Sequence, residues 1–115
     1  MFRLEFNAKN IMDFRIPDEA GNQPKKTPIC DSLKTTDCLL TALSTDDLYA
    51  GLKPNFENVR LSNSAGEFIC NFIFYRNLEI CKALFEETNC LATGLFVHIP
   101  TFKNCSEDKQ EAFIK

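Results

Sequence analysis

The stretch FENVRLSNSAGEFICNFIFY, residues 56–75, decides the fold because it combines a strand, a turn and the start of a long helix. Residues 56–62 are typical of a strand, and the four residues that follow are typical of a turn. Ser64, followed three residues later by Glu67, predicts a capping box at the start of a helix. We expect that helix to end at about Glu87.

Polar side chains of this helix recur at three- and four-residue spacing and predict one narrow polar stripe. They are Asn71, Tyr75, Glu79, Lys82 and Glu86. The remaining surface of the helix is nearly all apolar, and an apolar surface of that width has to be covered by other parts of the protein. We therefore expect the helix to be mostly buried.

Shorter elements are predicted on both sides of this stretch. Residues 2–6 and 93–99 are typical of strands, and residues 44–53 are typical of a short helix. A last helix is predicted to start at Ser106. Residues 15–29 contain three prolines and one glycine and predict a long loop. This order of elements indicates α/β layering within a single domain that spans the 115 residues.

Composition excludes two classes of function. Thirteen basic and sixteen acidic residues give a net charge of −3, and the longest basic run is Lys25-Lys26. Binding to a nucleic-acid backbone needs a basic patch, so no nucleic-acid partner is expected. The four glycines lie too far apart in the sequence to form a phosphate-binding loop. No nucleotide cofactor is expected for that reason.

The sequence predicts a cytoplasmic protein with no membrane partner. The first residues, MFRLEF, contain no apolar stretch of signal-peptide length, and no window of about 18 apolar residues occurs. In a reducing compartment, cysteines are expected as thiols, several of them packed in the core. The six cysteines are Cys30, Cys38, Cys70, Cys81, Cys90 and Cys105.

Two reactive side chains are candidates for chemistry. Cys70 lies early in the long helix, and His98, the only histidine, lies at the carboxyl end of the 93–99 strand. If this strand neighbours the 56–62 strand, their ends meet at one edge of the sheet. A helix N-terminus or a paired histidine activates a thiol for acyl transfer. Each residue on its own is also typical of an ordinary core cysteine or structural histidine, so the pair alone leaves both interpretations open.

A zinc site is a separate alternative for the same residue types. The spacings between Cys81, Cys90, His98 and Cys105 contain no tight two-ligand motif. We therefore expect no metal and no other cofactor.

Three blocks of the sequence, in order, resemble the type I pyroglutamyl peptidases, also called pyrrolidone-carboxylate peptidases. The blocks are DFRIPDEAGNQP at 13–24, LSNSAGEFICNFIFY at 61–75 and LFVHIP at 95–100. The resemblance implies that Cys70 is a nucleophile, that His98 is its general base and acid, and that Glu5 orients the histidine. It further implies that Arg15 lies beside the active site and that Phe68 and Ile69 form part of the substrate pocket.

The resemblance implies a three-layer α/β/α sandwich with a mixed, twisted sheet. Members of the family begin well upstream of the position that matches Glu5. We therefore expect an incomplete sandwich, in which the N-terminal strands and helices are absent. A sheet without its neighbours exposes unpaired edges. The isolated chain is accordingly expected to be marginally stable or to self-associate.

The function implied by the resemblance is that of a cysteine omega-peptidase, which removes pyroglutamate from the blocked N-terminus of a peptide. The partner would then be a pyroglutamyl-blocked peptide, and a homo-oligomer is also among the expected partners. The alternative is a catalytically inactive, truncated relative that serves as a binding or assembly module, or a gene fragment.

Overall fold

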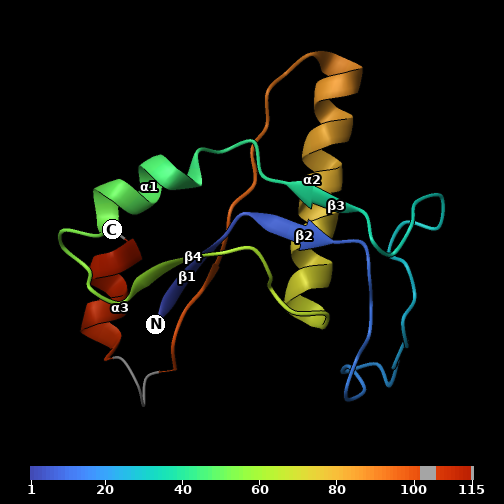
Figure 1. The fold of residues 1–115 in the computed structure, drawn as a ribbon, viewed down its shortest axis with the longest axis horizontal. Coiled ribbons are helices and arrows are strands. Elements are labelled where there is room, and N and C mark those ends of the chain that lie inside the picture. The colour runs from blue at the N-terminus through green and yellow to red at the C-terminus, as the bar shows by residue number, and fades with distance from the viewer. Residues whose placement is uncertain (102–105, 115) are drawn as a thin grey trace.

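The computed structural model describes residues 1–101 and 106–114. It contains five strands and three helices, and Figure 1 shows their arrangement. In chain order, the elements are β1 (Phe2–Glu5), β2 (Asn7–Lys9), β3 (Cys38–Leu40), α1 (Thr45–Leu52), β4 (Val59–Ser62), α2 (Ile69–Thr88), β5 (Phe96–His98) and α3 (Glu107–Ile114).

The first strand is the centre of a three-stranded mixed sheet with the order β4-β1-β5. β4 pairs with β1 in parallel, with Leu4 opposite Leu61. β5 pairs with β1 antiparallel, with Arg3 opposite His98. The predicted mixed sheet is confirmed, but the predicted neighbour of β5 is wrong, because β1 lies between β5 and β4.

The chain passes directly from this sheet into a second, two-stranded sheet. Only Phe6 separates β1 from β2, and its N–H donates to Ser62 while its carbonyl accepts from Thr41, each at 3.0 Å. β2 then pairs antiparallel with β3. The first nine residues therefore form one extended run that changes partner at Phe6.

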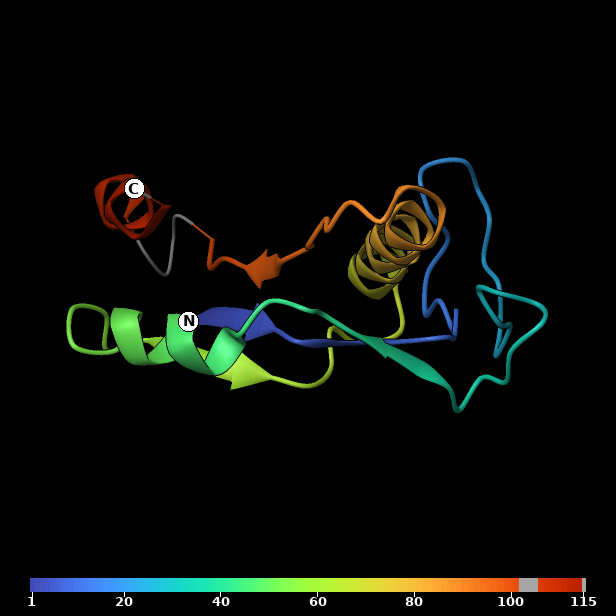
Figure 2. The same cartoon turned by 90° about the horizontal axis from the view of Figure 1, so that it is seen from above.

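Helices lie on opposite faces of the three-stranded sheet. Side chains alternate along β1, so Phe2 and Leu4 point to one face, where they pack with residues of α1. Phe96 of β5 is paired with Glu5 and points to the other face, where its ring meets Phe74 of α2 at 5.7 Å. This is the α/β/α arrangement that the resemblance implied. Figure 2 shows α1 beside β4 and α2 beside β2 and β3.

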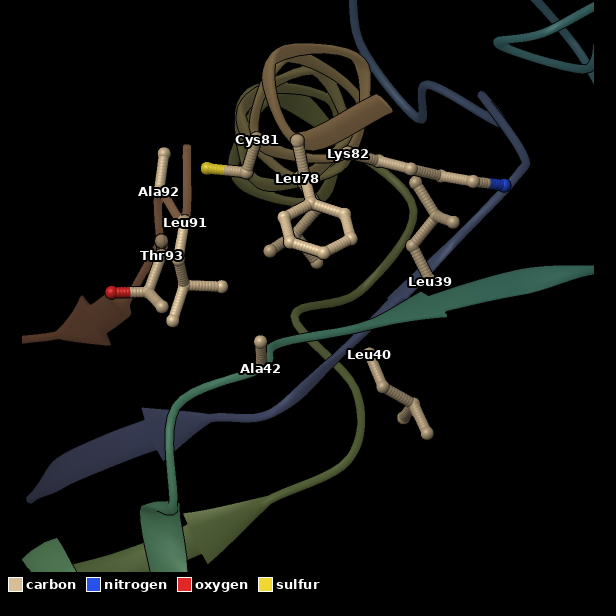
Figure 3. A pocket seen from close by; sticks show the side chains of 11 residues that line it. Leu39, Leu40, Ala42, Leu78, Cys81, Lys82, Leu91, Ala92 and Thr93 are labelled. Carbon is tan, nitrogen blue, oxygen red and sulfur yellow. The ribbon is translucent and has the colours of Figure 1, made fainter. Parts of the chain in front are cut away.

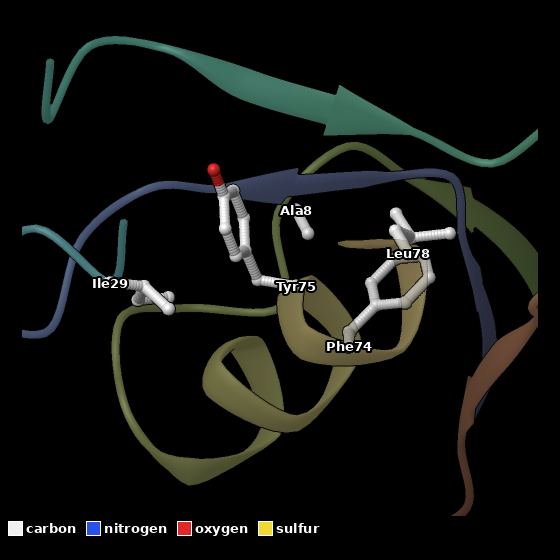
Figure 4. Packing of buried hydrophobic residues seen from close by; sticks show 5 residues of the cluster. All are labelled: Ala8, Ile29, Phe74, Tyr75 and Leu78. Carbon is white, nitrogen blue, oxygen red and sulfur yellow. The ribbon is translucent and has the colours of Figure 1, made fainter. Parts of the chain in front are cut away.

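A separate apolar cluster fixes α2 to the two-stranded sheet. Figure 4 shows its members, which are Ala8, Ile29, Phe74, Tyr75 and Leu78. Tyr75 is buried here, and burial, followed by the nearby Glu79 carboxylate, raises the pKa of its hydroxyl. The cluster therefore holds the amino-terminal half of α2 against β2.

The start of α2 differs from the predicted start. The helix begins at Ile69 with extended Phe68 as its N-cap, so the predicted capping box is wrong. The Ser64 hydroxyl accepts instead from the Gly66 N–H at 3.3 Å, which is a local turn that competes with capping. As a consequence Cys70 is the second residue of the helix and lies in its first turn.

The expectation that α2 is mostly buried is also wrong. The expected polar stripe includes Asn71 and Tyr75, and both of these are buried. Several apolar side chains are exposed in their place, with Ile80 at 59 % and Leu84 at 42 %. From residue 82 to its end, every residue of the helix is exposed. The carboxyl-terminal half of α2 is thus left without cover by the described residues.

Thiols and membrane spans were also predicted from the sequence. The five cysteines of the described ranges are all free, but Cys38 and Cys90 are exposed rather than packed in the core. Cys105 lies outside the described residues. Within residues 1–101 and 106–114, no helix combines the length and the apolar character that crossing a membrane requires.

Candidate active site

The histidine and the glutamate that the sequence singled out form a hydrogen bond. His98 Nδ1 lies 2.8 Å from Glu5 Oε1. Glu5 is fully buried, whereas the His98 side chain is 29 % exposed. A buried carboxylate accepts, so the ring nitrogen that faces it carries the proton. This leaves Nε2, the other ring nitrogen, with a free lone pair in the neutral ring.

The register of the sheet explains why these two side chains meet. His98 is directly opposite Arg3, and Glu5 is two residues further along β1. Glu5 and His98 therefore lie on the same face as diagonal neighbours, within reach of long side chains. The hypothesis that the 93–99 strand brings His98 to Cys70 as a neighbour of the 56–62 strand is wrong, because β1 lies between β4 and β5.

The Phe96 ring limits the freedom of the His98 ring from the side. The two rings meet edge to face at 5.1 Å. With Glu5 at one nitrogen and Phe96 against the ring, the orientation of the imidazole is fixed by contacts on two sides.

Cys70 and His98 line the same pocket, which has a volume of about 550 Å³. Cys70 is half-buried in the first turn of α2. The first N–H groups of a helix have no partner within it, and among the described residues no side chain caps this end. The pocket therefore combines a thiol, an imidazole and unpaired amides at the positive end of a helix dipole.

Two of the three predicted substrate-binding residues line this pocket and the third does not. Arg15 and Phe68 belong to it, together with the 64–66 turn. Ile69 lines a different pocket, formed with residues such as Met12 and Phe14 of the long loop. Successive residues at a helix start point in different directions, and that sends Ile69 away from Cys70.

Sequence reasoning missed three charged residues of the pocket: Lys9, Asp13 and Glu67. With Arg15, they give the rim two positive and two negative groups. Lys9 is the last residue of β2. Asp13 opens the first block that carried the resemblance, and this position was a signal that the sequence offered for it. Their grouping depends on a hydrogen bond of 3.0 Å from the Asp13 N–H to the Glu67 carbonyl.

Another, apolar pocket lies away from this site, between α2, β3 and the segment before β5. Figure 3 shows Leu39, Leu78, Cys81 and Leu91 around it. It holds neither Cys70 nor His98. In the part of the chain that the structure describes, no three His, Cys, Asp or Glu side chains gather as they would around a metal ion.

Comparison with known proteins extends the similarity over nearly the whole chain. The model of the pyroglutamyl peptidase family matches residues 1–113. A curated relative, pyrrolidone-carboxylate peptidase 1 of Photorhabdus laumondii, is 35 % identical over 98 residues, which cover 84 % of this chain and 44 % of the relative.

Solved structures agree with the sequence comparison. The pyrrolidone carboxyl peptidase of Fervidobacterium islandicum AW-1 superimposes with a TM-score of 0.72 at 29 % identity, over 86 % of this chain and 45 % of that one. The enzyme from Thermococcus litoralis gives a TM-score of 0.74 at 27 % identity, over 86 % and 42 %. The chain spans less than half the length of these relatives. With sequence blocks, fold and family model in agreement, the chain belongs to the pyroglutamyl peptidase family.

Proposed function

We propose that this chain carries the chemistry of a cysteine omega-peptidase that releases pyroglutamate from the N-terminus of a peptide. One observation supports it above the others: a thiol and a histidine share one pocket, and a buried carboxylate bonds the histidine from behind. Nucleophile, base and orienting group are the three parts that acyl transfer by a side chain requires.

In the proposed reaction, His98 acts through Nε2. Glu5 accepts a hydrogen bond from Nδ1–H, so the proton stays on Nδ1 and the lone pair stays on Nε2, the nitrogen proposed to face Cys70. The imidazole takes the thiol proton, and the sulfur forms a bond to the pyroglutamyl carbonyl carbon. The electron pair of the carbonyl moves to its oxygen, which becomes an oxyanion.

Unpaired amides at the start of α2 are the proposed partners of that oxyanion. The first N–H inside the helix that finds a backbone acceptor is that of Phe72, which bonds the Phe68 carbonyl at 3.1 Å. The N–H groups before it are therefore free to donate. One donor of this kind typically contributes about 3 kcal/mol to the transition state.

The remaining steps restore the enzyme. His98 returns its proton to the leaving amine as the carbon–nitrogen bond breaks, and a thioester of pyroglutamate remains on Cys70. Water then attacks the thioester, with His98 as base, and pyroglutamate leaves with the thiol restored. Phe68 is the proposed apolar wall for the small, uncharged lactam, and Arg15 is the proposed polar partner at the rim.

A fluorogenic pyroglutamyl amide tests the proposal directly. The chain should release the fluorophore, and Cys70→Ala and His98→Ala should each abolish release. Cys38→Ala is the matched control, because that thiol is exposed and lies outside the pocket. A folded wild-type sample without turnover, or full activity in Cys70→Ala, would overturn the proposal.

A second candidate is an inactive relative that serves as a binding or assembly module. The uncovered apolar half of α2 favours it, because contiguous exposed apolar surface marks interaction sites. Self-association of a folded sample that shows no turnover would support this candidate. Turnover that disappears with Cys70 would exclude it as the main function.

A cytoplasmic location remains a prediction, to be checked by cell fractionation.

A further inference from the structure

The residue after the proposed nucleophile forms a set of hydrogen bonds that the mechanism does not use. Asn71 is fully buried. Its Oδ1 accepts from the Lys9 N–H at 3.0 Å, and its Nδ2 donates to the Lys9 carbonyl at 2.9 Å and to the Ile11 carbonyl at 3.2 Å. One side chain thus forms hydrogen bonds to three backbone groups of a segment about 60 positions away in the sequence.

These bonds connect the two walls of the pocket. One wall is the segment 9–15, which contributes Lys9, Asp13 and Arg15, and the other is the segment 64–70, which ends with Cys70. The bond between Asp13 and Glu67 joins the same two walls at a second point. The rings of Phe14 and Phe68 also meet across the two walls, edge to face at 4.7 Å. Among the hydrogen bonds described between residues 9–15 and residues 64–71, only those of Asn71 come from a side chain, so a substitution can remove them.

The same bonds place the thiol relative to the histidine. Asn71 is covalently attached to Cys70, and Lys9 belongs to the extended run that begins with β1 and carries Glu5. Glu5 in turn holds His98. The position of the sulfur relative to the imidazole therefore depends on the bonds of Asn71 and on the extended run that ends at Lys9.

We infer that Asn71 is a positioning residue for the Cys70–His98 pair, an inference that rests on the proposed peptidase function. Asn71 is not among the residues that line the pocket of Cys70 and His98. Its buried amide fixes the first turn of α2 against Lys9 at the end of β2 and against Ile11, and β2 continues the extended run that carries Glu5 in β1. Asn71 thereby sets the approach of the thiol to the imidazole. A displacement of about 1 Å between reacting groups can lower the rate about 100-fold.

The chain offers a matched control for a merely structural role. Asn10 is also fully buried and also makes three hydrogen bonds to backbone: it receives the Cys30 N–H at 2.7 Å and donates to the Cys30 and Lys34 carbonyls at 3.0 Å. These bonds tie the segment to the loop around residue 30, away from the pocket. Asn10→Ala therefore removes a side chain of equal burial and equal hydrogen bonding, while the three bonds of Asn71 to its neighbours Lys9 and Ile11 keep both of their partners.

The test compares Asn71→Ala with Asn10→Ala in the full chain. We expect similar falls in melting temperature for the two variants. We expect kcat for a pyroglutamyl amide to fall at least tenfold further in Asn71→Ala, while KM changes by no more than a few-fold. Equal losses of kcat in the two variants would overturn the inference, as would a change confined to KM.

A second measurement separates the inference from the proposed function. Iodoacetamide labelling at pH 7, followed by mass spectrometry of the peptide that contains Cys70, reports the reactivity of that thiol without substrate. We expect slower labelling in Asn71→Ala than in wild type, and a wild-type rate in Asn10→Ala. Wild type without turnover contradicts the proposed function, whereas equal labelling in all three contradicts the positioning role.

If the alanine variant does not fold, Asn71→Asp replaces it. Aspartate keeps the size of the side chain and the acceptor for the Lys9 N–H, and it loses both donated bonds. The same reduced kcat and slower labelling are expected. If neither Asn71 variant folds while Asn10→Ala does, the residue serves the fold as a whole and the inference is wrong.

Discussion

Replacing Glu5 with glutamine alters the site by one atom and tests the role given to the carboxylate. In wild type, Oε1 accepts from His98 Nδ1, while Oε2 is buried and has no partner among the described residues. A glutamine can place its amide nitrogen at either position. At the Oε2 position its N–H groups would be buried without an acceptor, which is costly. We therefore expect the nitrogen to turn toward Nδ1.

This exchange should reverse the tautomer of the ring. A hydrogen bond to a charged group contributes about 1.5–3 kcal/mol, and about 1.4 kcal/mol corresponds to a factor of ten. The carboxylate therefore favours the Nδ1–H form by roughly one to two orders of magnitude. The glutamine amide donates to Nδ1 instead, so the ring proton moves to Nε2. Nε2 then has no lone pair with which to accept the thiol proton. In catalytic triads the equivalent exchange lowers kcat by about 10⁴.

The assay is direct because the chain has one histidine. With ¹⁵N-labelled histidine, NMR of the neutral ring shows which nitrogen carries the proton, free of signals from other histidines. We expect Nδ1–H in wild type and Nε2–H in Glu5→Gln, together with a fall in kcat of at least tenfold. The same tautomer and an unchanged kcat in both proteins would refute the reasoning.

Burial raises the pKa of Tyr75, so the folded state keeps a proton that the unfolded chain loses near pH 10, and stability should fall as pH rises through 10. Tyr75→Phe should flatten that fall in urea titrations, with Tyr49→Phe as control. The ring of Phe113 stacks on that of Phe2 with centroids 4.0 Å apart. Phe113→Ala should therefore lower the free energy of unfolding, measured by urea titration, by about 2–3 kcal/mol. Ile80→Lys should reduce self-association in analytical ultracentrifugation, because it places a charge on the uncovered apolar part of α2.

Most of the elements could be predicted because their signals are local. The alternation in residues 2–6 and the apolar run behind residue 68 each require only a short window of sequence. The start of α2 could not be found this way. Ser64 and Glu67 have the spacing of a capping box, but the Ser64 hydroxyl is occupied by a bond to Gly66. Two local structures compete for the same oxygen, and spacing does not distinguish between them.

The sequence identified most residues of the candidate site but not how they are arranged. Residue type and position made Cys70 and His98 candidates, and the resemblance added Glu5 and the role of each residue. The structure places Cys70 and His98 in one pocket. Composition could not reveal which strands pair, so β5 was expected beside β4 instead of β1. Asn71 was missed because its partners are backbone atoms, which leave no trace in side-chain patterns. Its polar character suggested solvent exposure, whereas it is fully buried.

The antiparallel register of β5 makes the segment between α2 and β5 a length-critical spacer. Side chains alternate across a strand, so a shift of β5 by one residue would exchange Val97 and His98 between the two faces of the sheet. The imidazole would then point toward α1, on the far side from the thiol. Within residues 89–95, the identity of Gly94 is restricted, because a Cβ there would clash with the Asn77 side chain. The length of the segment matters as well, because an insertion or deletion that moved β5 by one residue would separate the pair without altering either of its members.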